Sequence, residues 1–349
     1  MRILSILLVI AALNVQGAEF RDTILEKKCC EIIFSSLYYE RNITQVSVAI
    51  SENSTGAIKA LLVLTPGSGE WIVNHDVVRD IRPAHDRAIL YLCLLQIGAK
   101  PSDVFLSPSI YHDTVNGRTI RDRRWDYQGK EGPLCRLIDS DTGILFACET
   151  LFDCNIGTLA VNLRHAGAFL GDEDQTESDN TIYERYRNSR WKGTSVLGYD
   201  DYVSNMQMLI WMQGIATRGK MIMPRLSSEQ PYKEIYSSFS RKDYIDSLRA
   251  ALRLSVLHGM AKKANSSFVP VSGLTNISVE ESTGEHTATF LGYTDQYTMC
   301  VIVRGGISIN GDIPCSIAKN IIDYMVQEKD MRTVGTVERK KFHPAEKGR

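Results

Sequence analysis

Apolar residues recur at helical spacing in four segments of the chain. Arg21–Glu40 (RDTILEKKCCEIIFSSLYYE) places apolar side chains every three or four positions, the pattern of a helix with one buried face. The same spacing returns in Ser204–Thr217, Lys242–Lys263 and Pro314–Gln327. These segments predict amphipathic helices.

Alternation of apolar and polar residues predicts two pairs of strands. Gln45–Ser51 alternates, and Ile58–Thr65 follows it after a short turn that contains glycine, so the two segments predict a hairpin. His286–Tyr293 and Tyr297–Arg304 predict a second hairpin much later in the chain. Residues 100–142 are rich in Pro, Gly, Asp and Arg with little periodicity, and they predict mostly loop.

The order of these elements predicts an α+β fold. A helix comes first, followed by a hairpin, a large helical region, a second hairpin and a closing helix. An antiparallel sheet formed from both ends of the chain, with a helical lobe inserted between them, accommodates this order.

One apolar segment begins directly after a loop. In Ile81–Leu95 (IRPAHDRAILYLCLL), a proline and an alanine lead into a run that is apolar at almost every position. This pattern predicts a buried helix with His85 in or near its first turn. The free N–H groups and the dipole of a helix start favour developing negative charge, so enzymes often place a nucleophile there. His85, Asp86 and Arg87 are therefore candidates for chemistry.

The first residues of the chain indicate export. Arg2 precedes an apolar stretch from Ile3 to Leu13, and small residues follow near Gly17, a pattern typical of a secretory signal peptide. We predict that residues 1–17 are this signal, that residues 18–330 form one domain and that residues 331–349 are a disordered polar tail. No later segment has the roughly 20 apolar residues of a membrane-spanning helix. We therefore expect no transmembrane anchor after signal cleavage.

Charge and cysteine usage argue against two classes of function. The formal net charge is −1, whereas a nucleic-acid-binding domain is usually strongly basic, so no nucleic-acid partner is expected. The eight cysteines show no CxxC spacing and no histidines at zinc-finger distances, so we expect no metal site and no cofactor. Cys148 and Cys154 could form a disulfide, a pairing that the sequence leaves open.

Three segments resemble the transpeptidase domain of penicillin-binding proteins. QVSVAISENSTGAIKALLVLT (45–65) is similar to the opening hairpin of that family. GYDDYVSNMQMLIWMQGIATRGKMIMPRL (198–226) is similar to the family stretch that runs from a Gly-Tyr pair through a helix to a Gly-Lys and a proline. ESTGEHTATFLGYTDQYTMCVIVRGG (281–306) resembles the Lys-Thr-Gly strand and the strand after it. The segments follow the family order, so the resemblance implies a β-lactamase/transpeptidase-like fold.

The catalytic motifs of that family are degenerate in this chain. The family acylates the serine of a Ser-x-x-Lys motif with help from the lysine, and Ser-x-Asn and Lys-Thr-Gly motifs complete the site. Aligned through RPAHDRAI, the first motif puts His85 at the nucleophile position and Ala88 at the lysine position. The second motif falls on Asp153, Cys154 and Asn155, and the third on Ser282, Thr283 and Gly284. Because only Asn155, Thr283 and Gly284 match, the resemblance implies a pseudoenzyme.

Two alternatives would make this chain an active enzyme. Literal Ser-x-x-Lys matches occur at Ser189–Lys192 and Ser316–Lys319, so displaced residues could catalyse acyl transfer of the D,D-peptidase type. Alternatively, His85 could act as a new nucleophile or base oriented by Asp153, if the motifs meet as they do in the family. Asp86 cannot easily serve this purpose, since adjacent helical residues point about 100° apart.

The resemblance implies a place in the bacterial cell envelope or periplasm. We expect a transpeptidase-like domain that does not form an acyl-enzyme and that binds a peptidoglycan stem peptide or a protein partner of cell-wall synthesis. A stem peptide would lie extended against the Ser282 strand, in a groove lined by Asn155, Thr283 and Gly284.

Overall fold

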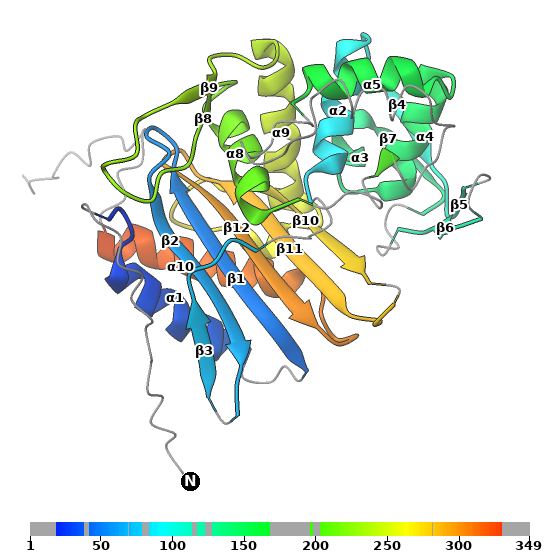
Figure 1. The fold of residues 1–349 in the computed structure, drawn as a ribbon. Coiled ribbons are helices and arrows are strands. Elements are labelled where there is room, and N and C mark those ends of the chain that lie inside the picture. Colours follow the sequence, from blue (N-terminus) through cyan, green and yellow to red (C-terminus); the bar gives the residue numbers. More distant parts are fainter. Residues whose placement is uncertain are drawn as a thin grey trace, which may run out of the picture.

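The fold is built around one antiparallel sheet (Figure 1). The computed structural model describes residues 19–37, 42–68, 70–78, 84–113, 117–122, 128–167, 196–197, 203–280 and 282–329. Within these ranges, six strands lie in the order β10-β11-β12-β1-β2-β3. Their bounds are β1 Ile43–Glu52, β2 Ile58–Pro66, β3 Trp71–Asn74, β10 Ser272–Val279, β11 His286–Tyr293 and β12 Tyr297–Gly305.

Both predicted hairpins are confirmed, and together they join the two ends of the chain. β1 pairs with β2 on one side and with β12 on the other, so that Val48 lies opposite both Leu62 and Val301. Each of these strands is apolar on both faces because helices cover both sides of the sheet. β10 and β3 remain as the two edge strands.

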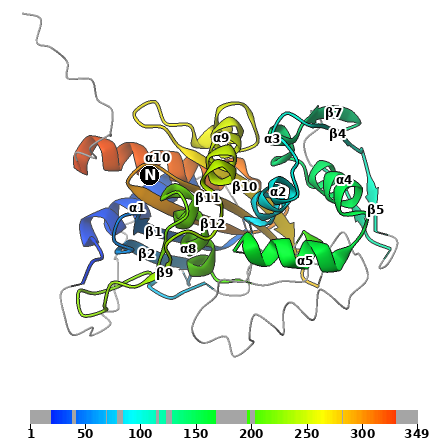
Figure 2. The ribbon, with the colours of Figure 1, turned by 90° about the horizontal axis from the view of Figure 1, so that it is seen from above.

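Helices pack on both faces of the sheet and form two separate cores (Figures 1 and 2). α1 (Thr23–Ser36) and α10 (Asp312–Lys329) cover one face. α8 (Asn205–Ala216) and α9 (Lys242–His258) cover the other face and meet α2 (Asp86–Gln96) there. All five confirm predicted helices: four were expected from apolar spacing and α2 from a continuous apolar run. α9 ends earlier than predicted, at His258, and a short 3₁₀ turn, η2 (Lys262–Ala264), follows it.

A helical lobe is inserted between the two hairpins, as predicted. It contains α2, α3 (Leu134–Leu137), α4 (Asp141–Phe152) and α5 (Ile156–His165). The expectation of mostly loop over residues 100–142 is partly wrong, because short strands pair there: β4 (Val104–Ser107) with β7 (Lys130–Pro133), and β5 (Tyr111–His112) with β6 (Thr119–Ile120). Strands of two to four residues are too short to show periodicity. A further small pair, β8 (Met221–Ile222) and β9 (Glu234–Tyr236), follows α8.

Several sequence predictions lie outside the described residues. They are the signal peptide at residues 1–17, the tail at 331–349 and the Ser189–Lys192 match. All eight cysteines are described, and each is a free thiol, Cys148 and Cys154 included. Across the described ranges no single helix is long and apolar enough to cross a membrane; α4 and the start of α5 meet the criterion only as a pair bent by 112°.

Candidate functional site

His85 lies directly before the first residue of α2, where the sequence predicted it. Its side chain is only 4% exposed, and its ring centroid lies 5.1 Å from that of Trp211. Burial lowers the pKa of His85 to about 3, so the imidazole is neutral near pH 7. Among the described residues, its Nδ1 has no hydrogen-bond partner. A buried base of such low pKa, whose Nδ1 none of the described residues orients, is poorly suited to activating a nucleophile.

Ala88, at the position of the family's lysine, is fully buried in the core beneath the helical lobe. A lysine placed there would need a partner for its charge. The alanine therefore fills apolar space, and it supplies no proton-transfer group.

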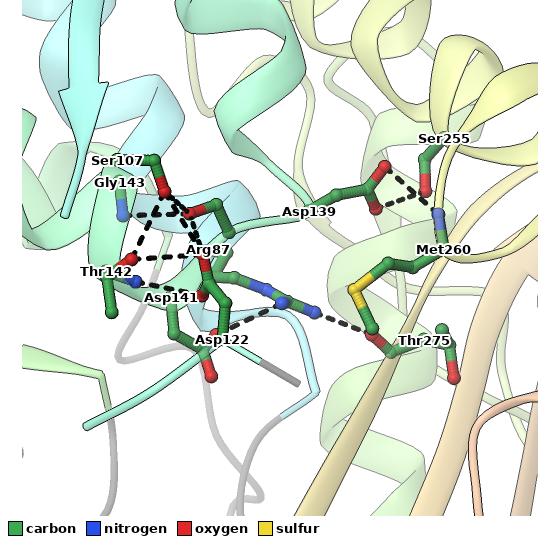
Figure 3. Close-up of polar contacts among 11 residues, drawn as sticks. Arg87, Ser107, Asp122, Asp139, Asp141, Thr142, Gly143, Ser255, Met260 and Thr275 are labelled. Carbon is green, nitrogen blue, oxygen red and sulfur yellow. Dashed lines mark hydrogen bonds and ion pairs between the residues drawn. The ribbon is translucent and has the colours of Figure 1, made fainter. Parts of the chain in front are cut away.

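Arg87 is the polar residue of the first turn of α2 that reaches across the structure (Figure 3). Its Nη1 donates to Asp141 Oδ1 at 3.0 Å, in the first turn of α4. Its Nη2 donates to the backbone carbonyl of Thr275 in β10 at 2.6 Å. The buried guanidinium thus connects two helices of the lobe to the edge of the sheet.

The bond to Thr275 also shows which backbone groups of β10 face outward. β10 is an edge strand, and the N–H and C=O groups of alternate residues in an antiparallel strand point to opposite sides. Thr275 points its carbonyl away from β11, and Glu280 donates its N–H inward to Glu285 at 2.8 Å. Ile277 and Val279 therefore share the outward orientation of Thr275. Among the described residues, we find no hydrogen bond to their outward groups.

A pocket of about 350 Å³ lies along this edge. It is enclosed by the first turn of α2, by the β5–β6 hairpin with Asp122, by Asp139 and Asp141 at the start of α4, by Met260 after α9 and by residues 275–279 of β10. The pocket therefore has the helical lobe on one side and an open strand edge on the other.

Hydrogen bonds to Asp122 stabilise one wall of this pocket. Its carboxylate accepts hydrogen bonds from the hydroxyls of Ser107 (3.1 Å), Ser140 (2.5 Å) and Thr142 (3.0 Å), and from the backbone N–H of Thr142 (3.2 Å). Ser140 also caps α4 by accepting from the N–H of Gly143 at 2.9 Å. The cluster fixes the segment after β6 to the first turn of α4 (Figure 3).

Asp139 fastens the opposite wall. It accepts from the hydroxyl of Ser255 on α9 at 2.6 Å and from the backbone N–H of Met260 at 3.2 Å. Figure 3 shows this carboxylate turned toward α9, whereas Asp141 faces Arg87. Each wall of the pocket is thus held by its own buried carboxylate.

The structure does not bring Asn155 to this pocket. Asp153 and Cys154 form a left-handed turn between α4 and α5, and Asn155 accepts from the N–H of Thr158 at 3.0 Å as the cap of α5. Asp153 and Asn155 line a different groove, of about 390 Å³, beside Ile97 and Gly98 at the end of α2. Ile97 lies ten residues after Arg87, which corresponds to about 15 Å along α2. Asp153 therefore does not orient His85.

The strand expected at Ser282 is a turn. Ser282, Thr283 and Gly284 are exposed between β10 and β11, and Gly284 has a φ of +70°. Glu285 donates its N–H to the hydroxyl of Thr283 at 3.2 Å, which closes the turn. Asn155, Thr283 and Gly284 therefore do not line one groove. The strand that lies beside Arg87 is instead β10, where the backbone carbonyl of Thr275 accepts from the guanidinium.

Ser316–Lys319 lies on α10, on the face of the sheet opposite the lobe (Figure 2). Lys319 Nζ is paired with Asp323 at 2.5 Å. This Ser-x-x-Lys match is therefore remote from the pocket.

Sequence reasoning missed two features of this site. Arg87 is a candidate for chemistry by sequence, whereas in the structure it pairs with Asp141 and Thr275, and an arginine in an apolar helix signals such buried partners. β10 was missed because its polar composition hides its alternation. Among the described residues, no group of three or more His, Cys, Asp or Glu side chains is arranged to hold a metal ion.

Comparison with known proteins identifies the fold. No family model matches the sequence, and no curated protein has a detectably similar sequence. Solved structures do match. A peptidoglycan synthetase from Bifidobacterium adolescentis is 13% identical, with a TM-score of 0.68 over 91% of this chain and 63% of that protein. A penicillin-binding protein from Mycobacterium tuberculosis is 15% identical, with a TM-score of 0.66 over 91% of this chain and 86% of that one.

A third match is to the structure of a single domain. The transpeptidase domain of penicillin-binding protein 3 from Burkholderia pseudomallei is 14% identical, with a TM-score of 0.63 over 93% of this chain and all of that domain. At identities of 13–15%, the structural similarity shows only a shared fold. The chain has a penicillin-binding-protein transpeptidase-like fold, as its sequence predicted, and it spans less than two thirds of the Bifidobacterium protein.

Proposed function

We propose that this chain is an exported, transpeptidase-like binding domain of the bacterial cell envelope that takes an extended cell-wall peptide along β10 and does not form an acyl-enzyme. The observation that supports it best is the open edge of β10. Ile277 and Val279 present backbone donors and acceptors to a pocket of about 350 Å³. An extended peptide can add to such an edge as a further strand, gaining main-chain hydrogen bonds.

The residues at the start of α2 support the absence of acylation. Where the fold's enzymes carry a serine nucleophile, this chain has the neutral, buried His85, and Ala88 replaces the lysine. The hydroxyls of Ser107, Ser140 and Thr142, behind one wall of the pocket, are buried and bonded to Asp122. The hydroxyl of Thr275, which lines the pocket, is buried and donates to the carbonyl of Thr289. None of them is presented to a substrate beside a base.

A titration of the mature chain with a defined peptide tests this function. The probe is Nα,Nε-diacetyl-Lys-D-Ala-D-Ala, and binding is followed by NMR chemical-shift changes. Ile277→Pro removes one outward N–H from the edge while leaving the ladder to β11 intact, so it should weaken binding at least tenfold. Val279→Pro, nearer the end of the strand, is the second variant if Ile277→Pro unfolds.

Ser278→Pro provides the matched control. Its N–H faces β11, so this change should lower the melting temperature by breaking the ladder. Saturable binding of the probe by the unaltered chain, lost in a folded Ile277→Pro or Val279→Pro variant, supports the proposal. Absence of binding, or binding that both edge variants retain, would refute it.

A further inference from the structure

We infer that the outer face of the β8–β9 hairpin binds a linear, uncharged glycan, at a site separate from the edge of β10. Tyr232, Glu234 and Tyr236 alternate along this segment, so their side chains point to the same face. At the rise of an extended strand, the two tyrosines lie about 13 Å apart. The face formed by these three residues and Lys220 is called the tyrosine stripe below.

Burial and backbone pairing support this arrangement. Ile235, which alternates with the stripe, packs against the core instead. The ladder continues past β9, because Met223 donates its N–H to the carbonyl of Lys233 at 2.9 Å. Tyr232 is 44% exposed and Tyr236 is 40% exposed. Figure 1 shows β8 and β9 at the end of the sheet where β1 turns into β2, so the stripe lies on an accessible part of the molecule.

The ring of Tyr232 is held in one orientation. The guanidinium of Arg225 lies 5.8 Å from its centroid, and Lys220 Nζ lies 5.4 Å from it. The hydroxyl of Tyr232 donates to Glu234 Oε1 at 3.0 Å, and Lys220 Nζ lies 2.6 Å from the same oxygen. Arg225 in turn donates to the carbonyl of Thr55 at 3.2 Å. A ring fixed before binding loses little conformational freedom when a ligand stacks on it.

The chemistry of the stripe matches a sugar chain better than a protein partner. The C–H groups on one face of a pyranose ring stack on an aromatic ring, whose face is partly negative. Between the tyrosines, the side chains of Glu234 and Lys220 are 36% and 38% exposed, and they offer an acceptor and a donor to hydroxyl groups. Because these two charges are paired, the stripe complements an uncharged ligand.

The stripe also lacks the apolar centre of a protein interface. Among the described residues, no Leu, Ile, Val or Met side chain between positions 221 and 236 is largely exposed. The aromatic side chains that are largely exposed in the described ranges are Tyr232, Tyr236 and Phe268, and two of the three lie on this face. One pyranose ring covers one tyrosine, so both tyrosines contribute only when the ligand is an oligosaccharide.

A titration of the mature chain with chitotetraose, followed by NMR chemical-shift changes, tests this inference. Cellotetraose, which lacks the N-acetyl groups, and N-acetylglucosamine are the comparison ligands. We expect saturable binding of a tetrasaccharide and at least tenfold weaker binding of the monosaccharide. Tyr232→Ala and Tyr236→Ala should each weaken tetrasaccharide binding about tenfold, whereas Tyr232→Phe keeps the ring and should retain most of the affinity. A preference between the two tetrasaccharides identifies whether the natural glycan contains amino sugars.

Phe268→Ala removes an exposed aromatic ring elsewhere and should leave binding unchanged. Ile277→Pro should also retain glycan binding, because β11 and β12 separate β10 from β1 in the sheet. The result is therefore independent of peptide binding along β10. Failure of both tetrasaccharides to bind would overturn the inference. Binding that persists in both tyrosine-to-alanine variants, or an equal loss in Phe268→Ala, would overturn it as well.

Discussion

His85 and Arg87 lie two residues apart, and both are buried, but their polar atoms are satisfied to different extents. His85 stays neutral, packed beside Trp211, and leaves its Nδ1 without a partner among the described residues. Arg87 is bonded to the carboxylate of Asp141 and to a strand carbonyl. An unpaired buried polar atom costs stability, whereas a paired charge connects the elements that supply its partners. At the residue scale, the first turn of α2 connects the helical lobe to the sheet.

The neutral state of His85 predicts a loss of stability in mild acid. Its pKa is about 3 in the folded chain and near 6.5 when unfolded, so the unfolded state binds more protons below pH 6.5. Stability is therefore undiminished by this group above pH 6.5 and falls as the pH drops from there toward 3. The loss between pH 7 and pH 5 should be about 2 kcal/mol. Urea unfolding at both values measures it.

His85→Leu is the variant that isolates this contribution. It removes the titrating group and the unpaired Nδ1, while the carboxylates of the chain titrate in both proteins and cancel in the difference. The variant should lose about 2 kcal/mol less than the unaltered chain on going to pH 5. Equal losses in the two proteins would mean that His85 is protonated or exposed in the folded state.

At the element scale, the pocket depends on how the lobe is fastened to the sheet. Asp122 joins the segment after β6 to α4, Asp139 joins the lobe to the end of α9, and Arg87 joins α2 to β10. These connections come from residues that are distant in sequence and lie in segments with little periodicity. They hold the walls apart and leave the edge of β10 open between them.

Removing the carboxylate of Asp122 should destabilise the domain. Asp122→Ala leaves the hydroxyls of Ser107, Ser140 and Thr142 without their shared acceptor in a buried position. We expect a loss of about 3 kcal/mol in the free energy of unfolding, measured with urea. Asp243→Ala, which removes an exposed carboxylate paired with Arg241, is the comparison and should change stability little. Similar losses of unfolding free energy for the two substitutions would show that the hydrogen bonds of Asp122 do not stabilise the domain.

The sequence predicted elements with long periodic patterns and missed those fixed by tertiary contacts. The two central hairpins, α1, α2, α8 and α10 were expected from apolar spacing, because each buries a continuous face. β10 was missed because an edge strand is partly open, so Thr275, Asn276 and Ser278 interrupt its apolar residues. The letters Thr283-Gly284 matched a motif, yet they form a turn. Contacts between segments that are distant in the chain, such as the bond from Arg87 to β10, leave no local pattern in a single sequence.

At the scale of the whole molecule, the chain has a penicillin-binding-protein transpeptidase-like fold. The solved structures match this chain over 91–93% of its length. The start of α2 carries a buried histidine and a buried alanine, and the literal Ser-x-x-Lys on α10 lies on the other face of the sheet. These features favour the proposed binding along β10 over acyl transfer.

The most direct test of this account is an intact-mass spectrum of the mature protein after incubation with a broad-spectrum penicillin. Loss of the serine nucleophile lowers the rate of acyl-transfer enzymes by about a million-fold, so acylation should not be detectable. We predict an unchanged mass under conditions that fully label an active penicillin-binding protein. A mass increase equal to one drug molecule, mapped by peptide digestion to a serine, would contradict the account and reveal a working nucleophile.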